Sequence, residues 1–282
     1  MKKILLPTDF SDNSWNAISY ALKLFKDETC VFYLLNTYTP IIHDVEYFQL
    51  SNTQFELADA LKEESQTGLE EIKNRIETEF KNPKHTFTLI SSFNNLIKEI
   101  EELHKGNVMD FIVMGTKGAT GAKKILFGTN TVHVINNVKC PVLAIPENYV
   151  FETPHEILFP SDYGVDFQDK HLQPIMDIAS FHNARVNILH ATYGYNLSEE
   201  QERNKQKLEI YFKQITHLFH SISNQNVQEA ITSFQLKSRI NMLVMINNKH
   251  SFFENLFFRS TIKQIGFHLS IPFLVIPSKT LK

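Results

Sequence analysis

The stretch KKILLPTD (residues 2–9) and its near repeat HEILFPSD (residues 155–162) decide the fold of this 282-residue chain. Each is typical of a short buried strand, and each ends in proline, a hydroxyl residue and aspartate. Segments with helical periodicity follow both strands, at 14–26 and 166–182. An internal repeat of this length indicates two copies of one fold rather than a solenoid, whose period is about 20–50 residues.

The two halves also continue and close alike. The second strands are VFYLLNTY (31–38) and VNILHATY (186–193), the fourth are FIVMG (111–115) and MLVMI (242–246), and the closing strands are CPVLAIP (140–146) and IPFLVIP (271–277). Third strands are expected near 85–91 and 217–222, with helices after them at 94–105 and 226–239. Buried strands that alternate with helices indicate a parallel sheet covered on both faces. We therefore expect an α/β fold of two tandem doubly wound, five-stranded parallel sheets.

The boundary between the copies is expected at ENYVFETP (147–154), which is short, mostly polar and ends in proline. This gives a first domain of residues 1–147 and a second of 153–282. The first copy is longer, because Ile157 follows Ile4 by 153 residues, whereas Pro277 follows Pro146 by only 131. The surplus of 22 residues falls within 38–84, in a strongly helical stretch and the loop before it.

This longer segment has two readings. It is either a surface helix with a connecting loop, which most such insertions are, or a lid or docking surface. The second reading would rest on four apolar and aromatic residues, Ile41, Ile42, Tyr47 and Phe48.

Composition excludes several classes of protein. The chain is 43% apolar and 21% charged, has 23 phenylalanines and carries a net charge of -3, so we expect folded cores and neither a nucleic-acid nor an anionic-membrane surface. No apolar run approaches the roughly 20 residues of a membrane span, and a cytoplasmic protein is expected. Two cysteines, Cys30 and Cys140, are too few for a disulfide scaffold and are expected in the cores.

Glycines concentrate in one place. Gly115, Gly118, Gly121 and Gly128 fall within fourteen residues, after the strand FIVM and before the helical segment TNTVHVINNV. Glycine allows positive φ and close backbone approach, and the first amides of a helix have no partner within it. At the carboxyl end of a parallel strand, this arrangement is a plausible cradle for phosphate oxygens.

Spacing excludes two familiar cradles. No glycine is followed by Lys-Ser or Lys-Thr, as a P-loop requires, and the first strand is followed by PTDFSD rather than a Gly-x-Gly pair. The spacing is instead Gly, two residues, Gly, nine residues, Gly-Thr. With the PTD turn, the nucleotide loop FIVMGTKGATGAKKILFGTN and the closing strand CPVLAIP, the chain resembles the universal stress protein family, specifically its ATP-binding branch, as two tandem copies over nearly its whole length.

The resemblance implies a sheet ordered 3-2-1-4-5, with adenine near the ends of strands one and two and the triphosphate on the glycine loop. By position, the adenosine would lie beside Pro7, Thr8 and Asp9, with the backbone of Thr37 at the adenine edge and with Met114 and Gly115 on the ribose side. The phosphates would be held by Gly118, Gly128, Thr129 and Asn130. Asp9 could also ligate a nucleotide-bound Mg²⁺, since such ions take one or two carboxylates plus phosphates.

The second copy departs from this pattern. Alignment of the closing strands puts Ile246, Lys249 and Arg259 at the positions of Gly115, Gly118 and Gly128, and only Ser260 keeps the hydroxyl of Thr129. Side chains therefore occupy the space for phosphate, and we expect ATP in the first domain only. We expect no metal site at His217 or His220 and no partner nucleophile for His133 or His190.

No catalytic constellation emerges from the sequence, so we assign no catalytic residue and expect a binding module rather than an enzyme. Two alternatives stay open, a slow ATPase or phosphotransferase and an interaction protein with an empty pocket. The two halves are expected to associate within one chain as a pseudo-dimer through their apolar closing strands, with a homodimer of chains as a further option. The stress served and any protein partner are not specified by the sequence.

Overall fold

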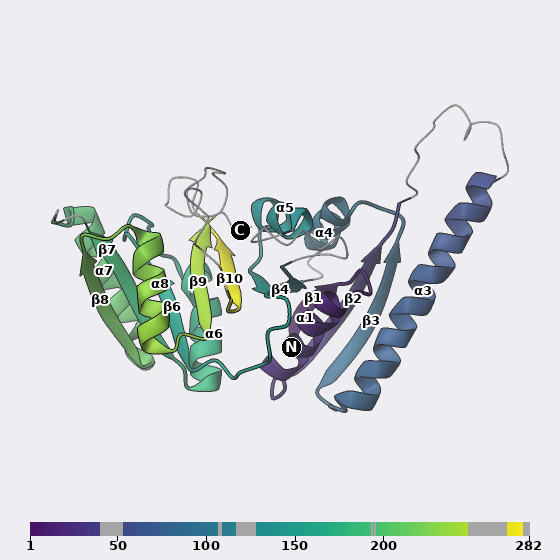
Figure 1. Ribbon diagram of the computed structural model, residues 1–282, viewed down its shortest axis with the longest axis horizontal. Helices are drawn as coiled ribbons and strands as arrows, with labels where there is room; N and C mark the ends of the chain where they lie inside the picture. Colours follow the sequence, from purple (N-terminus) through teal and green to yellow (C-terminus); the bar gives the residue numbers. More distant parts are fainter. Residues whose placement is uncertain are drawn as a thin grey trace. The chain divides into compact units, whose positions relative to one another are not determined.

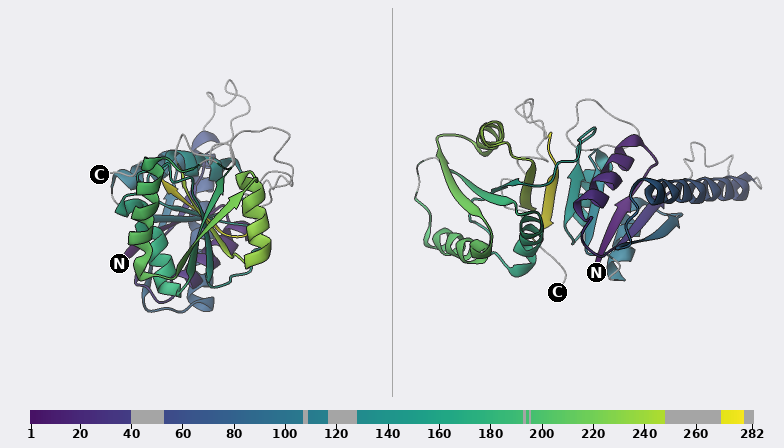
Figure 2. Two further views of the ribbon diagram at one scale, coloured as in Figure 1. Left: turned by 90° about the vertical axis from the view of Figure 1, so that its left-hand side faces the viewer. Right: turned by 90° about the horizontal axis from the view of Figure 1, so that it is seen from below.

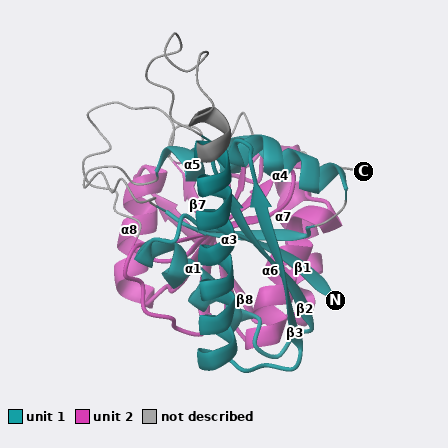
Figure 3. Cartoon of the chain, turned by 90° about the vertical axis from the view of Figure 1, so that its right-hand side faces the viewer, with its two compact units in different colours: residues 1–138 teal, residues 139–282 magenta. Residues whose placement is uncertain are grey.

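The computed structural model describes most of the chain (Figure 1). The described residues are 1–39, 53–106, 109–116, 128–192, 194, 196–247 and 270–278. They separate into two compact units, residues 1–138 and 139–282 (Figure 3). The expected domain bounds, 1–147 and 153–282, place the division slightly later and stay a prediction about the two repeats.

Unit 1 alternates strands and helices as expected. Its elements are β1 (Lys2–Pro7), α1 (Asp12–Leu24), β2 (Cys30–Thr37), α3 (Thr53–Glu79), β3 (His85–Ser92), α4 (Leu96–Lys105), β4 (Phe111–Gly115) and α5 (Thr129–Asn137). The strands pair in the order β3-β2-β1-β4 and all run parallel. Ile4, Leu5 and Leu6 of β1 are fully buried, as expected for a strand with neighbours on both sides and helices on both faces.

The helices of unit 1 divide between the two faces of the sheet. α1 and α3 contact each other, since the guanidinium carbon of Arg75 lies 3.8 Å from the centre of the Trp15 ring. α3 packs on β2 and β3, and α4 lies on the opposite side of the strands from α1 (Figure 3). Ser11 is the N-cap residue of α1, and its Oγ accepts a hydrogen bond from the amide of Ser14. Asp12 in the first turn complements the helix dipole.

Unit 2 repeats the plan. Its elements are β5 (Val142–Ile145), β6 (Glu156–Pro160), α6 (Asp169–His182), β7 (Arg185–Thr192), α7 (Glu199–Tyr211), a 3-10 turn (Phe212–Gln214), β8 (His217–Ser223), α8 (Val227–Ser238), β9 (Met242–Asn247) and β10 (Phe273–Pro277). Five strands run parallel in the order β10-β9-β6-β7-β8, which is the order 3-2-1-4-5 read from the other end. Figure 2 shows α8 on one side of these strands and α6 and α7 on the other.

The expected α/β fold with parallel sheets is confirmed, and one detail differs from two separate five-stranded sheets. β5, the closing strand of the first repeat, pairs antiparallel with β10, with Leu143 opposite Leu274. All four residues of β5 are buried, so pairing satisfies the backbone of a strand that cannot face water. Among the described helices, none combines the length and apolar character that a membrane span requires.

Candidate functional site

The candidate site lies where three parallel strands of unit 1 end at one edge of the sheet. β1 lies between β2 and β4, and the chain moves from β1 to β2 on one side and reaches β4 only later on the other. The strand order therefore reverses between β1 and β4. Ligands of doubly wound proteins bind in the crevice outside the carboxyl ends of the strands at this point.

The turn after β1 is fixed by its own side chains. The amide of Thr8 donates to the carbonyl of Leu35 at 2.8 Å, and the amide of Phe10 donates to Thr8 Oγ1 at 3.0 Å. Asp9 Oδ1 accepts from both the amide and the hydroxyl of Ser11, at 3.2 and 2.6 Å. Phe10 has φ 62°, a conformation that costs free energy for a bulky residue. Asp9 therefore has a structural role in the turn, and its exposed carboxylate also faces solvent at the edge.

Gly115 at the end of β4 has a packing reason that the sequence did not reveal. A Cβ placed there would lie 2.4 Å from Nδ2 of Asn13, which is on α1, and 3.2 Å from the Asn13 carbonyl oxygen. The carbonyl of Gly115 accepts a hydrogen bond from Thr131 Oγ1 at 2.8 Å. The missing side chain thus allows α1 to approach β4, whether or not a ligand binds nearby.

The start of α5 is held at the same edge. Gly128 is its N-cap residue, and the Gly128 amide donates to the carbonyl of Thr116, directly after β4. As a glycine, Gly128 has no side chain with which to cap this helix, and the first turn contains no acidic residue, whereas Ser11 caps α1 and Asn95 caps α4. The first amides of α5 have no partner within the helix, so this end carries a partial positive charge suited to an anion.

The residues predicted from the sequence are placed as follows. Pro7 and Thr8 are buried at the end of β1, Asp9 is exposed, and Thr37 is half-buried at the end of β2. Met114 and Gly115 are buried in β4, and Thr129 and Asn130 are exposed in the first turn of α5 after half-buried Gly128. These nine residues occupy one edge of unit 1. Gly118 lies outside the described residues, as do Ile41, Ile42, Tyr47, Phe48, Lys249, Arg259 and Ser260.

Polar residues that sequence reasoning did not select lie beneath this edge. Asn13, Ser14 and Asn36 are each less than a tenth exposed, as is Thr8. The hydroxyls of Thr8 and Ser14 are 3.0 Å apart, and Asn36 Nδ2 donates to the Thr8 carbonyl at 2.8 Å. A signal was available for Asn36, because it interrupts the apolar run of β2.

A groove of about 490 Å³ opens beside the turn on the side of α3. It is lined by Phe10, Ala60, Glu63, Glu64, Thr67, Gly68 and Glu71. Three carboxylates would repel a triphosphate. On electrostatic grounds, the start of α5 is therefore a better place for phosphate than this groove.

The corresponding turn of unit 2 has the same hydrogen bonds. The amide of Ser161 donates to the carbonyl of Leu189 at 2.9 Å, and the amide of Tyr163 donates to Ser161 Oγ at 3.0 Å. Asp162 Oδ1 accepts from the amide of Gly164 at 2.9 Å, and Tyr163 has φ 56°. The Pro-Thr-Asp and Pro-Ser-Asp turns are therefore built alike.

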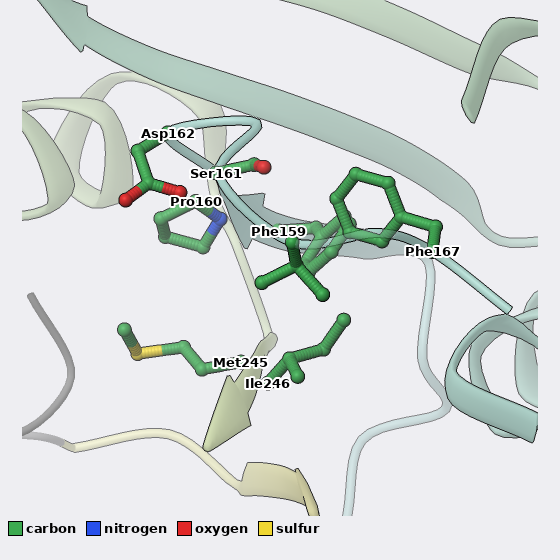
Figure 4. A pocket seen from close by; sticks show the side chains of 8 residues that line it. Phe159, Pro160, Ser161, Asp162, Phe167, Met245 and Ile246 are labelled. Atoms are coloured by element: carbon green, nitrogen blue, oxygen red, sulfur yellow. The ribbon is translucent and has the colours of Figure 1, made fainter. Parts of the chain in front are cut away.

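Within the described residues, little space is left beside the turn of unit 2. A cavity of about 20 Å³, which has room for about one water molecule, lies among these residues (Figure 4). Its lining includes Asp162, Met245 and Ile246. Tyr163 is 2% exposed and stacks on His190 with the ring centres 5.0 Å apart, and burial raises the pKa of its hydroxyl to about 12. Ile246, predicted to fill the position of Gly115, is buried against this cavity.

The cysteines and histidines show no reactive or metal-binding arrangement within the described residues. Cys30 and Cys140 are buried free thiols, and burial raises the pKa of Cys30 to about 11, which disfavours a thiolate. His220 Nε2 is hydrogen-bonded to Asn187 Oδ1 at 3.0 Å. No group of three or more His, Cys, Asp or Glu side chains in the described part of the chain could hold a metal ion.

The fold is that of a doubly wound α/β protein. Its N-terminal unit has polar residues at the edge of the sheet where ligands of such proteins bind. Residues 1–146 match the sequence pattern of the universal stress protein family. The universal stress proteins MJ0531 and MJ0577 of Methanocaldococcus jannaschii are 35% identical over 144 residues and 30% identical over 161 residues. The matches cover 51% of this chain in both cases and 81% and 94% of the relatives. The chain belongs to the universal stress protein family.

A solved structure extends the likeness in fold to both units. The crystal structure of a universal stress protein from Archaeoglobus fulgidus superposes with a TM-score of 0.69 and covers 98% of each chain, at 19% identity. At this identity the likeness concerns the fold alone. It agrees with the α/β architecture of residues beyond 146.

Proposed function

We propose that this protein binds ATP at the carboxyl edge of unit 1, between β1 and β4, and works as a binding or regulatory module of a stress response. The start of α5 is the observation that carries the proposal. It lies after β4, is tethered through the Gly128 amide to the Thr116 carbonyl, has at its N-cap a glycine with no side chain to occupy the first amides, and has no acidic residue in its first turn. Backbone amides arranged in this way favour phosphate oxygens.

Two further features support ATP rather than an unspecified anion. The spacing of Gly115, Gly118 and Gly128 is typical of the ATP-binding branch that the chain resembles, and the family itself is shown. The exposed carboxylate of Asp9 at the same edge suits a Mg²⁺ ion that is also bound by phosphates. Such an ion would neutralise phosphate charge, and Asp9 would hold it in place.

The proposal extends to the organisation of the whole chain. The matching turns at Thr8 and Ser161 support a tandem form in which the second copy, residues 153–282, is degenerate because its pocket is filled. The antiparallel pairing of β5 and β10 supports an intrachain pseudo-dimer through the closing strands. We further propose a cytoplasmic location and leave a homodimer of chains as an additional option.

Nucleotide exchange and titration test the proposed function. The purified protein is stripped of co-purified nucleotide and titrated with ATP in a calorimeter with and without Mg²⁺, and the released phosphate is counted in parallel. Saturable ATP binding with negligible phosphate release is expected of a binding module. Steady phosphate release would indicate the ATPase alternative, and the absence of any binding would indicate the nucleotide-free interaction protein.

A further inference from the structure

Asn36 is a buried polar residue in a strand that is otherwise apolar up to this point. It is 8% exposed and follows Leu34 and Leu35, both of which are fully buried. Burial of a side-chain amide costs free energy unless the amide is hydrogen-bonded. For packing alone, an aliphatic residue would be expected at this position. The Nδ2 atom of Asn36 instead donates to the carbonyl of Thr8 at 2.8 Å.

We infer that Asn36 is a positioning residue of the candidate nucleotide site, acting through the peptide between Thr8 and Asp9; this inference rests on the proposed function. Because the peptide group is planar, fixing the Thr8 carbonyl fixes the direction of the Asp9 amide and the place of the Asp9 Cα. Asn36 thereby holds the exposed carboxylate of Asp9 toward the edge. It touches the turn and not the nucleotide.

The other hydrogen bonds of Thr8 show why the bond from Asn36 to the Thr8 carbonyl is important for the turn. The amide of Thr8 is held by the Leu35 carbonyl, and its hydroxyl lies 3.0 Å from both Ser14 Oγ and the amide of Phe10. Among the described residues, the hydrogen bond to the Thr8 carbonyl comes from Asn36. The next residue but one, Phe10, has φ 62°, and such a conformation persists only where its surroundings determine it.

The second unit makes the same bond with a different residue. His190 directly follows Leu189, as Asn36 directly follows Leu35, and His190 Nδ1 lies 3.0 Å from the carbonyl of Ser161. A carbonyl only accepts, so Nδ1 of His190 carries the proton and donates. Two side chains of unlike shape thus supply a donor to the equivalent carbonyl, which indicates that the position requires a donor.

The test compares three variants of the full chain. Asn36→Leu removes the donor at similar volume, and Asn36→His supplies the donor used in unit 2. The matched control is Asn204→Leu, because Asn204 is 3% exposed and its Nδ2 donates to the Tyr163 carbonyl at 2.9 Å in the second turn. Each protein is titrated with Mg-ATP in a calorimeter, and deuterium exchange is measured on the peptide that covers residues 6–14.

The expected results separate positioning from stability. Asn36→Leu weakens ATP binding about tenfold, which corresponds to one buried hydrogen bond, while Asn36→His stays within about threefold of the wild type and Asn204→Leu within about twofold. Exchange in residues 6–14 becomes faster in Asn36→Leu alone. Unchanged binding in Asn36→Leu, or an equal loss in Asn204→Leu, would overturn the inference.

Failure of the proposed function would look different. If the wild type binds no ATP, the proposed function is wrong, and deuterium exchange decides the positioning claim by itself. Faster exchange in residues 6–14 of Asn36→Leu, restored in Asn36→His, supports the role of Asn36 in the turn. Exchange equal to the wild type in Asn36→Leu refutes it.

Discussion

Gly115→Ala tests whether close packing explains this glycine. The added Cβ would lie 2.4 Å from Asn13 Nδ2 and 2.9 Å from Asn13 Cγ, far inside normal contact distance. Overpacking of a buried site typically costs about 1–3 kcal/mol. For a unit of this size we expect the midpoint of thermal unfolding to fall by roughly 3–9 °C, at about 3 °C per kcal/mol.

A double-mutant cycle identifies the partner. In Asn13→Ala the amide that meets the new Cβ is absent, so Gly115→Ala should cost less in that background, with a coupling of about 0.5–2 kcal/mol measured by urea unfolding. The Asn13 carbonyl oxygen, 3.2 Å away, still limits the recovery. A cost below about 0.5 kcal/mol in the wild type, or strict additivity in the cycle, would refute the packing explanation.

Three further predictions concern binding, the second unit and pH. Asp9→Ala should keep the fold but lose the ATP-induced rise in the unfolding midpoint; an unchanged rise on a lower baseline would make Asp9 a turn residue only. Ile246→Ala should destabilise the protein by about 2 kcal/mol or more without adding a second ATP site in calorimetry. Burial lowers the pKa of His171, which donates to the Ser278 carbonyl, below its usual 6.5. As the pH falls, the unfolded chain therefore takes up this proton before the folded chain does, and the free energy of unfolding should decrease as the pH drops through 6.5. The decrease should be smaller in His171→Gln, and an equal dependence of the unfolding free energy on pH in the two proteins would contradict this.

Sequence patterns predicted the fold closely because the signals were local and repeated. FIVMG (111–115) coincides with β4, and the two repeats fixed the alternation of strands and helices. The antiparallel pairing of β5 with β10 was not predictable in its register, because pairing between strands distant in sequence is set by tertiary packing.

The candidate site was predictable only in part. The residues at strand ends, such as Asp9 and Thr37, could be chosen because parallel strands end at one edge. The supporting residues could not be chosen, because they act through contacts with distant parts of the sequence. Asn13 lies against Gly115, 102 residues away, and Asn36 is hydrogen-bonded to Thr8, 28 residues away. Gly115 illustrates the difference, since the sequence suggested a ligand and the structure adds a neighbouring helix.

The stoichiometry of ATP binding tests the central claim most directly. Equilibrium dialysis with labelled ATP is applied to nucleotide-free wild type, to Gly118→Val, whose site lies in the glycine stretch, and to Lys249→Ala, at the matching position of the second copy. The account predicts one ATP per chain for the wild type and Lys249→Ala, and loss of binding in a folded Gly118→Val protein. Two ATP molecules per chain, none at all, or normal binding by folded Gly118→Val would contradict it.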